Sequence, residues 1–289
     1  MKIIDVHTHG IGGYDTRTPD EKDILAIAAT HGSLGVAEII LAIYPAAIKV
    51  MRKHMDVVRR AMERQKDMAD TQARIIGVHL EGPFLNPLQC GALDAAVFLE
   101  PTGYHLQKLI EGFEDIVKII TIAPEMKGAA GTIRKIADKG IIPSMGHSAA
   151  TYSEAEKGFN AGARGITHIF NAMRCFHHRE PGIAGFGLLN QEVYIEVIAD
   201  PFHLHPATID LIFKVKNPAR IIIISDSVSG TKMAGSSQGV TDGSGRLVGG
   251  SMTIMESARQ LVEMGCEKNA VMNCVAVNPN RYLANANII

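Results

Sequence analysis

Short apolar runs rich in Ile and Val alternate along the chain with longer segments in which apolar residues recur at helical spacing. Eight of these runs predict buried strands, because they are short, β-branched and bounded by polar or turn-forming residues. They are Ile3–Val6, Ala37–Ile43, Ile75–Leu80, Val117–Ile122, Ile141–Met145, Gly165–Ile169, Tyr194–Ile198 and Ile221–Ile224. Eight strands that alternate with helices predict an α/β fold, a closed parallel (β/α)8 or TIM barrel.

The segments between the runs predict the helices of that barrel. They are Pro19–Thr30, Ala47–Met68, Thr102–Glu111, Thr132–Lys139, Tyr152–Ala161 and Pro206–Val215, followed by two closing helices, Met255–Met264 and Lys268–Val277. The Gly- and Ser-rich stretch Ser229–Gly250 predicts a long loop or a mobile lid. After the closing helices, NPNRYLANANII shows no further strand pattern.

Composition favours one globular domain, which we expect to span residues 1–289. Apolar residues make up 46% of the chain, charged residues 20%, and the net charge of −1 provides no basic field, so we expect no nucleic-acid partner. No apolar run is long enough to cross a bilayer and the N-terminus lacks a signal-peptide pattern, so we expect a cytoplasmic protein without a membrane partner. The four cysteines show no C-x-x-C spacing, which argues against a thiolate zinc site and a disulfide framework.

The residues capable of chemistry follow the predicted strands. The strand ends carry, in chain order, HTHG, HLEGP, APE, GHS, THIFNA, ADPFHLH and SDS, with only the second strand lacking such a motif. Because the carboxyl ends of all strands in a parallel barrel open on the same face, these residues are expected to converge although more than two hundred positions separate them.

Together these strand ends predict a metal centre. His7 and His9 alternate along the first strand and therefore share a face with Asp5. A single histidine at a strand end is more often a hydrogen-bonded structural residue. A carboxylate, several imidazoles and an aspartate at one rim, however, form the nitrogen and oxygen set that Zn²⁺ or a similar divalent ion prefers.

Asp226 is our candidate for proton transfer. It follows IIIIS, a run so apolar that its strand must be buried on both faces and must deliver the carboxylate to the barrel mouth. There it can take a proton from a metal-bound water and pass it to a leaving amine. The alternative is that Asp226 only caps the following turn.

The motifs resemble the N-acetylglucosamine-6-phosphate deacetylase family of the amidohydrolase superfamily. The matching stretches occur in family order along nearly the whole chain: IDVHTHGIGG, GVHLEGPFLNP, TIAPE, GHSAATYSEA, THIFNAM, HREPGIAG, ADPFHLHP, SDS, GGSMTIMESARQLVE and NPNRYL. The resemblance implies a metal-dependent enzyme that hydrolyses the N-acetyl amide of a phosphorylated amino sugar, releasing acetate.

The resemblance also implies the roles of individual residues. Glu81, His147 and His168 would bind the main divalent ion, Zn²⁺ being the first choice and Fe²⁺ or Mn²⁺ remaining open, with Asp226 as the catalytic acid and base. Some members of the family hold a second ion on a His-x-His pair after the first strand. His7 and His9 match that type, so one or two ions per subunit are expected.

Further resemblance implies substrate contacts and a homodimer. The implied substrate-binding residues are Asn171, Ala172, Arg179, His203, Gly249, Gly250 and Ser251. In the family the arginine reaches the phosphate of the substrate in a neighbouring subunit. The planar guanidinium of Arg179 suits a phosphate, whereas an exposed ion pair with the adjacent Glu180 is the alternative.

Three features depart from the family. Gly91, Ala92 and Leu93 stand where the family has G-x-H, so the imidazole that would contact the substrate carbonyl is absent. Pro201 gives DPFH in place of DGxH, and the family's small β-sandwich is missing at both ends. These departures leave two rival hypotheses: an amidohydrolase with another N-acyl or cyclic amide substrate, and a barrel that binds a ligand or a partner but no longer catalyses.

Overall fold

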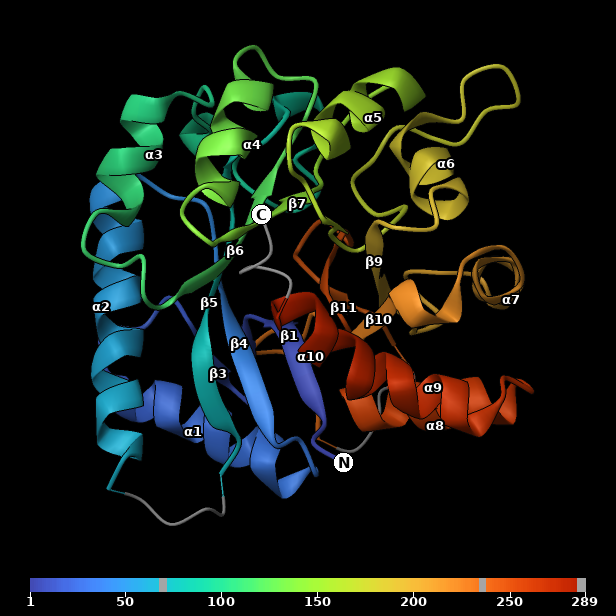
Figure 1. Ribbon diagram of the computed structural model, residues 1–289. Coiled ribbons are helices and arrows are strands. Elements are labelled where there is room, and N and C mark those ends of the chain that lie inside the picture. The colour runs from blue at the N-terminus through green and yellow to red at the C-terminus, as the bar shows by residue number, and fades with distance from the viewer. Residues whose placement is uncertain (68–71, 234–237, 285–289) are drawn as a thin grey trace.

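The computed structural model describes residues 1–67, 72–233 and 238–284, and these residues contain a parallel eight-stranded sheet surrounded by helices (Figure 1). The strands of this sheet follow one another in chain order: β1 (Ile4–Thr8), β4 (Glu38–Ile43), β5 (Arg74–Phe84), β6 (Val117–Ile122), β7 (Ile142–Met145), β8 (Gly165–Ile166), β9 (Tyr194–Ile198) and β10 (Ile221–Ile224). Each predicted run contributes one of them.

The sheet closes on itself between β10 and β1. The amide of Asp226 donates to the carbonyl of His7 at 3.0 Å, and the amide of His9 donates to the carbonyl of Ser227 at 2.7 Å. Thr8 and Ser227 form a parallel bridge just beyond the regular part of β10. The predicted (β/α)8 barrel is therefore confirmed.

Helices follow most strands close to the predicted positions. Their bounds are α1 (Glu21–Ser33), α2 (Ile48–Gln65), α3 (Gly103–Ile110), α4 (Ala129–Ala137), α5 (Tyr152–Asn160), α6 (Gly182–Leu189), α7 (Pro206–Val215), α8 (Ile254–Glu263), α9 (Lys268–Val275) and α10 (Val277–Ala284). Side-chain caps explain several starts, such as the reciprocal capping box of Thr151 and Glu154 at α5. Met68, the predicted end of the second helix, lies outside the described residues.

Two of the α-helices in the described residues, α6 and α10, were not predicted. The sequence of α6, GIAGFGLL, has no polar face because all but its last residue are buried, and its glycines are poor helix formers. A Cβ on Gly187 would lie 2.7 Å from Ile166, so glycine lets this helix approach β8. The other, α10, has Pro279 in its first turn, which a helix tolerates there.

Some predicted strand bounds were wrong, and the predicted loop contains two short strands. The sixth run was expected to continue to Ile169, but β8 ends at Ile166 because the chain turns at His168. The stretch Ser229–Gly250 contains a hairpin of β11 (Val240–Thr241) and β12 (Leu247–Gly249). Residues 234–237 of that stretch, like residues 285–289, lie outside the described part of the chain. A second small hairpin joins β2 (Gly10–Ile11) to β3 (Tyr14–Asp15).

The barrel interior is apolar at the amino ends of the strands and polar at the carboxyl ends. Ile4, Ile119 and Ile222 pack in the apolar part around Tyr282, which reaches in from α10. A Cβ on Gly165 would lie 2.0 Å from the Tyr282 hydroxyl, so this glycine makes room for the ring. The described residues therefore fill the floor of the barrel, and the cavity at the strand ends opens at the carboxyl end. Among the helices as described, none has the length and apolar character to cross a membrane.

Candidate active site

A cavity of about 240 Å³ opens at the carboxyl ends of the strands and brings together most of the predicted site residues. The predicted metal ligands His9, Glu81, His147 and His168 line it together with Asp226, and they come from the ends of five different strands. Glu81, His147 and His168 are no more than 4% exposed, and Asp226 is 8% exposed. The expected convergence is therefore present in the structure.

Glu81 lies at the centre of this group. Its Oε1 is 3.1 Å from Nε2 of His147 and 3.0 Å from Nε2 of His168. Its Oε2 is 3.2 Å from Nε2 of His9. One carboxylate thus faces three imidazole nitrogens, and Glu81, His147 and His168 together can offer three ligand atoms to one ion.

His7, His9 and Asp226 form a neighbouring group of possible ligands. The Nε2 atoms of the two histidines are 3.3 Å apart. Asp226 Oδ1 lies 3.4 Å from Nε2 of His7 and 3.7 Å from Nε2 of His9. His7 is fully buried beneath the cavity, so only His9 of the pair lines its wall.

The hydrogen-bond partners of these histidines fit a divalent cation. His147 Nδ1 is 2.9 Å from the carbonyl of Gln89, an acceptor that requires the ring proton on Nδ1. In the neutral ring, Nε2 then presents a lone pair to the Glu81 carboxylate, and two acceptors face each other at 3.1 Å. A cation between them relieves this conflict, and imidazole with carboxylate is a donor set typical of Zn²⁺.

The backbone is strained at the same residues. Among the described residues other than glycine, a positive φ occurs only at His147, His168, Phe170, Ala172 and Asp226. Four of these five line the cavity. Left-handed φ values cost free energy for residues with a Cβ and gather where a site needs a fixed side-chain direction. The strain therefore marks this cavity, independently of its side-chain chemistry.

Burial and charge set the proton affinities of the two carboxylates in opposite directions. Burial, together with the nearby Glu81 charge, raises the pKa of Asp226 well above its usual value. Burial also acts to raise the pKa of Glu81, but the imidazoles of His147, His168 and His9 around its carboxylate outweigh burial and hold that pKa well below the usual value. Two carboxylates with separated proton affinities are the arrangement expected where one binds a cation and the other exchanges a proton.

The predicted substrate-binding residues divide into two sets. Asn171, Ala172, His203 and Gly249 line the cavity. Gly250 and Ser251 do not line it; instead their amides donate to the carbonyl of Asp226 at 2.7 Å and to Oδ2 of Asp200 at 2.8 Å.

Asp200 connects Ser251 to His203. Its Oδ1 is 3.0 Å from Nδ1 of His203, and it also accepts from the His203 amide at 2.9 Å. Although burial acts to raise the pKa of Asp200, these hydrogen bonds lower it to about 2. Pro201 fits the same turn, since Asp favours the first position of a turn and Pro the second. The turn thus accommodates Pro201, and Nε2 of His203 has no hydrogen-bond partner among the described residues.

Arg179 and Leu93 do not provide the substrate contacts that the family pattern would place in this cavity. Arg179 is exposed, its Nη1 lies 3.0 Å from His178 Nε2, and it does not line the cavity of its own chain. Leu93 does line the cavity, so an apolar side chain stands in the wall where the family has an imidazole.

Sequence reasoning missed two polar side chains that line the cavity, those of Tyr44 and Arg246. Tyr44, just after β4, stacks on the His9 ring with 3.8 Å between centroids, and Arg17 lies over the Tyr44 ring at 4.3 Å. Arg246, from the β11–β12 hairpin, donates from Nη1 to the carbonyl of Gly91 at 2.7 Å and is the one Lys or Arg lining this cavity in the described residues. The position of Tyr44 at a strand end was the available signal, whereas the hairpin gave none.

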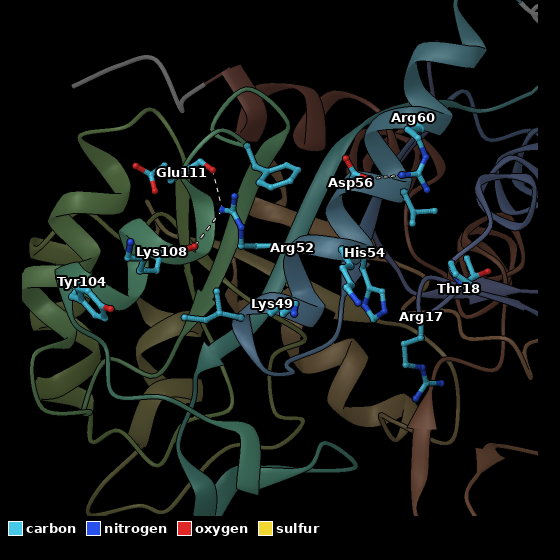
Figure 2. A pocket seen from close by; sticks show the side chains of 15 residues that line it. Arg17, Thr18, Lys49, Arg52, His54, Asp56, Arg60, Tyr104, Lys108 and Glu111 are labelled. Atoms are coloured by element: carbon cyan, nitrogen blue, oxygen red, sulfur yellow. Dashed lines mark hydrogen bonds and ion pairs between the residues drawn. The ribbon is translucent and has the colours of Figure 1, made fainter.

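A larger cavity, of about 1160 Å³, lies away from the strand ends on the outer surface between α2 and α3 (Figure 2). Arg52 donates there to the carbonyls of Lys108 and Glu111, at 3.2 and 2.9 Å. Arg60 pairs with Asp56 and Glu21. Most of its guanidinium groups are thus already partnered, and none of the candidate metal ligands lines this groove.

Comparison with known proteins places the chain among sugar-phosphate deacetylases. The chain matches no family profile. It is 31% identical over 297 residues to the N-acetylgalactosamine-6-phosphate deacetylase of Escherichia coli O157:H7, a match that covers 97% of this chain and 76% of that enzyme. It is 30% identical over 271 residues to the N-acetylglucosamine-6-phosphate deacetylase of Vibrio furnissii, covering 90% of this chain and 67% of that enzyme.

Solved structures give the same result. The N-acetylglucosamine-6-phosphate deacetylase of Thermotoga maritima superposes with a TM-score of 0.85 at 25% identity, covering 98% of this chain and 78% of that one. A variant of the Mycobacterium smegmatis enzyme, solved in complex with N-acetyl-D-glucosamine-6-phosphate, superposes with a TM-score of 0.86 at 26% identity and covers 98% and 77%.

Proposed function

Because this chain belongs to the N-acetylglucosamine-6-phosphate deacetylase family, we propose that it hydrolyses the N-acetyl amide of N-acetylglucosamine-6-phosphate to glucosamine-6-phosphate and acetate. The observation that carries the proposal is the convergence of Glu81, His147 and His168, with Glu81 Oε1 3.1 and 3.0 Å from the two imidazoles. The proposed hydrolysis depends on a divalent metal ion, and Glu81, His147 and His168 would hold the main ion. We expect Zn²⁺ first, ahead of Fe²⁺ and Mn²⁺.

His7 and His9 would hold a second ion beside the first. Their Nε2 atoms lie 3.3 Å apart, and both face the carboxylates of Glu81 and Asp226. When bound, a divalent ion supplies Lewis-acid polarisation of an amide carbonyl and favours the ionisation of water.

Asp226 moves the proton in the proposed reaction. Its carboxylate takes a proton from the attacking water as the new C–O bond forms at the acetyl carbon. It then gives this proton to the amide nitrogen as the C–N bond breaks, so acetate and a free amine leave. The bond from Gly250 to the Asp226 carbonyl and the positive φ of 47° hold this residue at the cavity wall.

The other lining residues would bind the sugar and its phosphate. Asn171, Ala172, His203 and Gly249 offer polar and backbone groups around the cavity, while Gly250 and Ser251 support Asp226 and Asp200 from behind. Arg246 supplies a guanidinium within the chain. Arg179, exposed in its own chain, is available to the substrate of a neighbouring subunit, and we propose a homodimer on that basis.

A cytoplasmic location is part of the same proposal. A sugar phosphate is charged and does not cross a bilayer unaided, so an enzyme that consumes it works in the compartment where it is made. The net charge of −1 is consistent with a small-molecule enzyme rather than a nucleic-acid binder.

Leu93 favours a second candidate function, hydrolysis of a different N-acyl substrate. An apolar side chain in the cavity wall cannot donate a hydrogen bond to the acetyl carbonyl. It would tolerate a larger acyl group or another amide.

Acetate release from N-acetylglucosamine-6-phosphate, from its galactosamine isomer and from unphosphorylated N-acetylglucosamine tests the proposal. We expect turnover of a phosphorylated sugar and a much higher KM for the unphosphorylated one, with Arg179→Ala lowering kcat/KM for the phosphorylated sugar alone. Equal turnover with and without the phosphate, unchanged by Arg179→Ala, would favour the second candidate. No turnover of any of the three by metal-loaded protein would reject the proposed deacetylation of N-acetylated amino sugars.

A further inference from the structure

A carboxylate without a hydrogen-bond partner lies beneath the candidate metal centre. Glu196, on β9, is fully buried, and among the described residues neither of its carboxylate oxygens accepts a hydrogen bond. Its Oε2 lies 3.5 Å from Nδ1 of His7, which also lacks a hydrogen-bond partner. Because a buried polar group without a partner costs free energy, this pair requires an explanation.

The second histidine near Glu196 is already engaged. Nε2 of His79 is 2.7 Å from the Thr121 hydroxyl, and its Nδ1 is 3.4 Å from the carbonyl of Val6. Both ring nitrogens of His79 therefore have partners, although the three residues lie close enough to form a possible ligand group. Among the described residues, the Nδ1 atom of His7 is thus the nitrogen beside the carboxylate that has no hydrogen-bond partner. The engagement of His79 also argues against an additional ion between His7, His79 and Glu196.

The two nitrogens of His7 point to different surroundings. Nδ1 faces Glu196, whereas Nε2 faces His9 at 3.3 Å and Asp226 at 3.4 Å. A proton on Nδ1 directs the Nε2 lone pair toward the cavity, and a proton on Nε2 would block that lone pair. The tautomer of His7 therefore decides whether it can serve as a ligand.

We propose that Glu196 is a positioning residue that accepts a hydrogen bond from the Nδ1–H group of His7. This hydrogen bond keeps the proton on Nδ1 and leaves the lone pair of Nε2 available to the second metal ion. The inference rests on the proposed function, specifically on an ion at His7 and His9. His147 has the matching arrangement for the main ion, with the Gln89 carbonyl as its acceptor at 2.9 Å. A carboxylate acceptor makes the imidazole more basic than a carbonyl does, and such outer partners typically contribute about 10- to 100-fold in metal affinity.

Metal titration of metal-free protein tests this role, with Zn²⁺ or Co²⁺ as the probe and calorimetry as the readout. For the wild type we expect two binding steps. Glu196→Leu, which removes the acceptor, is expected to weaken the second step about 10- to 100-fold and to leave the first unchanged. Glu196→Gln, which keeps one acceptor oxygen, should lose less.

Ser144→Ala is the matched control. Ser144 is also fully buried in the barrel interior, where it bonds to Thr167 rather than to His7. We expect it to leave both binding steps unchanged. A loss of the second step as large as that of Glu196→Leu would mean that any polar change in the interior disturbs the site, and would overturn the assignment.

Thermal unfolding separates positioning from a structural role. Because the Glu196 carboxylate is fully buried and its one contact with His7 is long, at 3.5 Å, its removal should leave the Tm of the metal-free Glu196→Leu protein at or above that of the wild type, while the rise in Tm on adding metal becomes smaller. A lower Tm without metal would contradict the inference. Two ions in the wild type with an unchanged second step in Glu196→Leu would overturn the role of Glu196 alone, whereas a single ion in the wild type would refute the second ion and this inference with it.

Discussion

The two largest differences between the cavity at the strand ends and the groove between α2 and α3 are size and the state of their polar atoms. The groove has a volume of about 1160 Å³ against about 240 Å³ for the strand-end cavity. In the groove, Arg17, Arg52 and Arg60 are paired with carboxylates or backbone carbonyls. Around the smaller cavity, imidazoles and carboxylates are buried, and among the described residues His7, His9, His168 and Glu196 have buried atoms without a hydrogen-bond partner, whereas in the groove only Nδ1 of His54 does.

This difference shows that unsatisfied buried groups indicate a reactive site better than volume does. A solvated, paired charge has little left to offer a ligand, whereas a buried lone pair retains a large interaction energy. Backbone strain follows the same division, since His147, His168 and Asp226 all have positive φ values. The changes below rank from those that should abolish the difference to those that should leave it untouched.

Asp226→Asn is expected to have the largest effect. The amide cannot accept the proton of water, so kcat for N-acetylglucosamine-6-phosphate should fall by about 10³-fold or more. Initial rates of acetate release measure this, and metal analysis of the same sample should give the wild-type ion content for the main site. Near-normal turnover would remove Asp226 from the mechanism.

Acidification should destabilise the protein through His31, which is buried behind the cavity and contacts the Thr8 hydroxyl at 3.1 Å. Burial lowers the pKa of His31 from 6.5 to about 4. Below pH 6.5 the unfolded chain therefore takes up a proton that the folded chain does not, and this uptake favours the unfolded state. The free energy of unfolding should fall by an amount on the order of 3 kcal/mol as the pH falls from 6.5 to 4.

Urea unfolding of wild type and His31→Gln at several pH values checks this expectation. The free energy of unfolding of the variant should depend less steeply on pH between 6.5 and 4. Parallel profiles for the two proteins would show that His31 stays accessible to protons in the folded state.

Arg246→Ala should have an intermediate effect. Loss of one charge-assisted hydrogen bond to the phosphate costs about 1.5 kcal/mol, so KM for the phosphorylated sugar should rise roughly tenfold. Arg246→Lys keeps the charge, so its KM for the phosphorylated sugar should rise less. For the unphosphorylated sugar, KM should be the same in the wild type and in both variants. An equal loss with both sugars would assign Arg246 to the contact with Gly91 alone.

Lys53→Ala and Lys49→Ala in the groove should have the smallest effects. Both side chains are exposed, so kcat/KM should stay within about twofold and the free energy of unfolding within about 0.5 kcal/mol. A loss of activity comparable to that of Arg246→Ala would mean that the groove takes part in catalysis, and the contrast between the two cavities would fail.

The strand ends were predictable because alternation and β-branched runs report burial directly. Parallel closure then brings Glu81, His147 and His168 to one rim whatever the loops do between them. The buried helix α6 was not predictable, since glycines selected for close packing at Gly187 lower its intrinsic helix propensity. Local sequence cannot report contacts between separate elements.

Glu196 and Arg246 are two residues whose roles depend on contacts between separate elements. Glu196 reads as one polar residue in an apolar strand, and its meaning depends on His7, which lies far away in sequence and meets it only across the barrel. Arg246 belongs to a Gly-rich stretch whose hairpin register is fixed by contacts such as that with Gly91. The positive φ values of His147 and Asp226 are likewise set by the packed environment and not by residue type.

The seam between β1 and β10 joins the first strand of the chain to the eighth. His7 and His9 stand on one side of it and Asp226 on the other, and the amide of Asp226 is bonded to the carbonyl of His7. An ion shared by these residues would crosslink the end of β1 to the end of β10, two segments that are synthesised far apart in time. The proposed second site cannot be completed until the eighth strand of the sheet is available, so capture of the second ion would belong to the last stages of folding, and a chelator that removes this ion should weaken the sheet at this seam first.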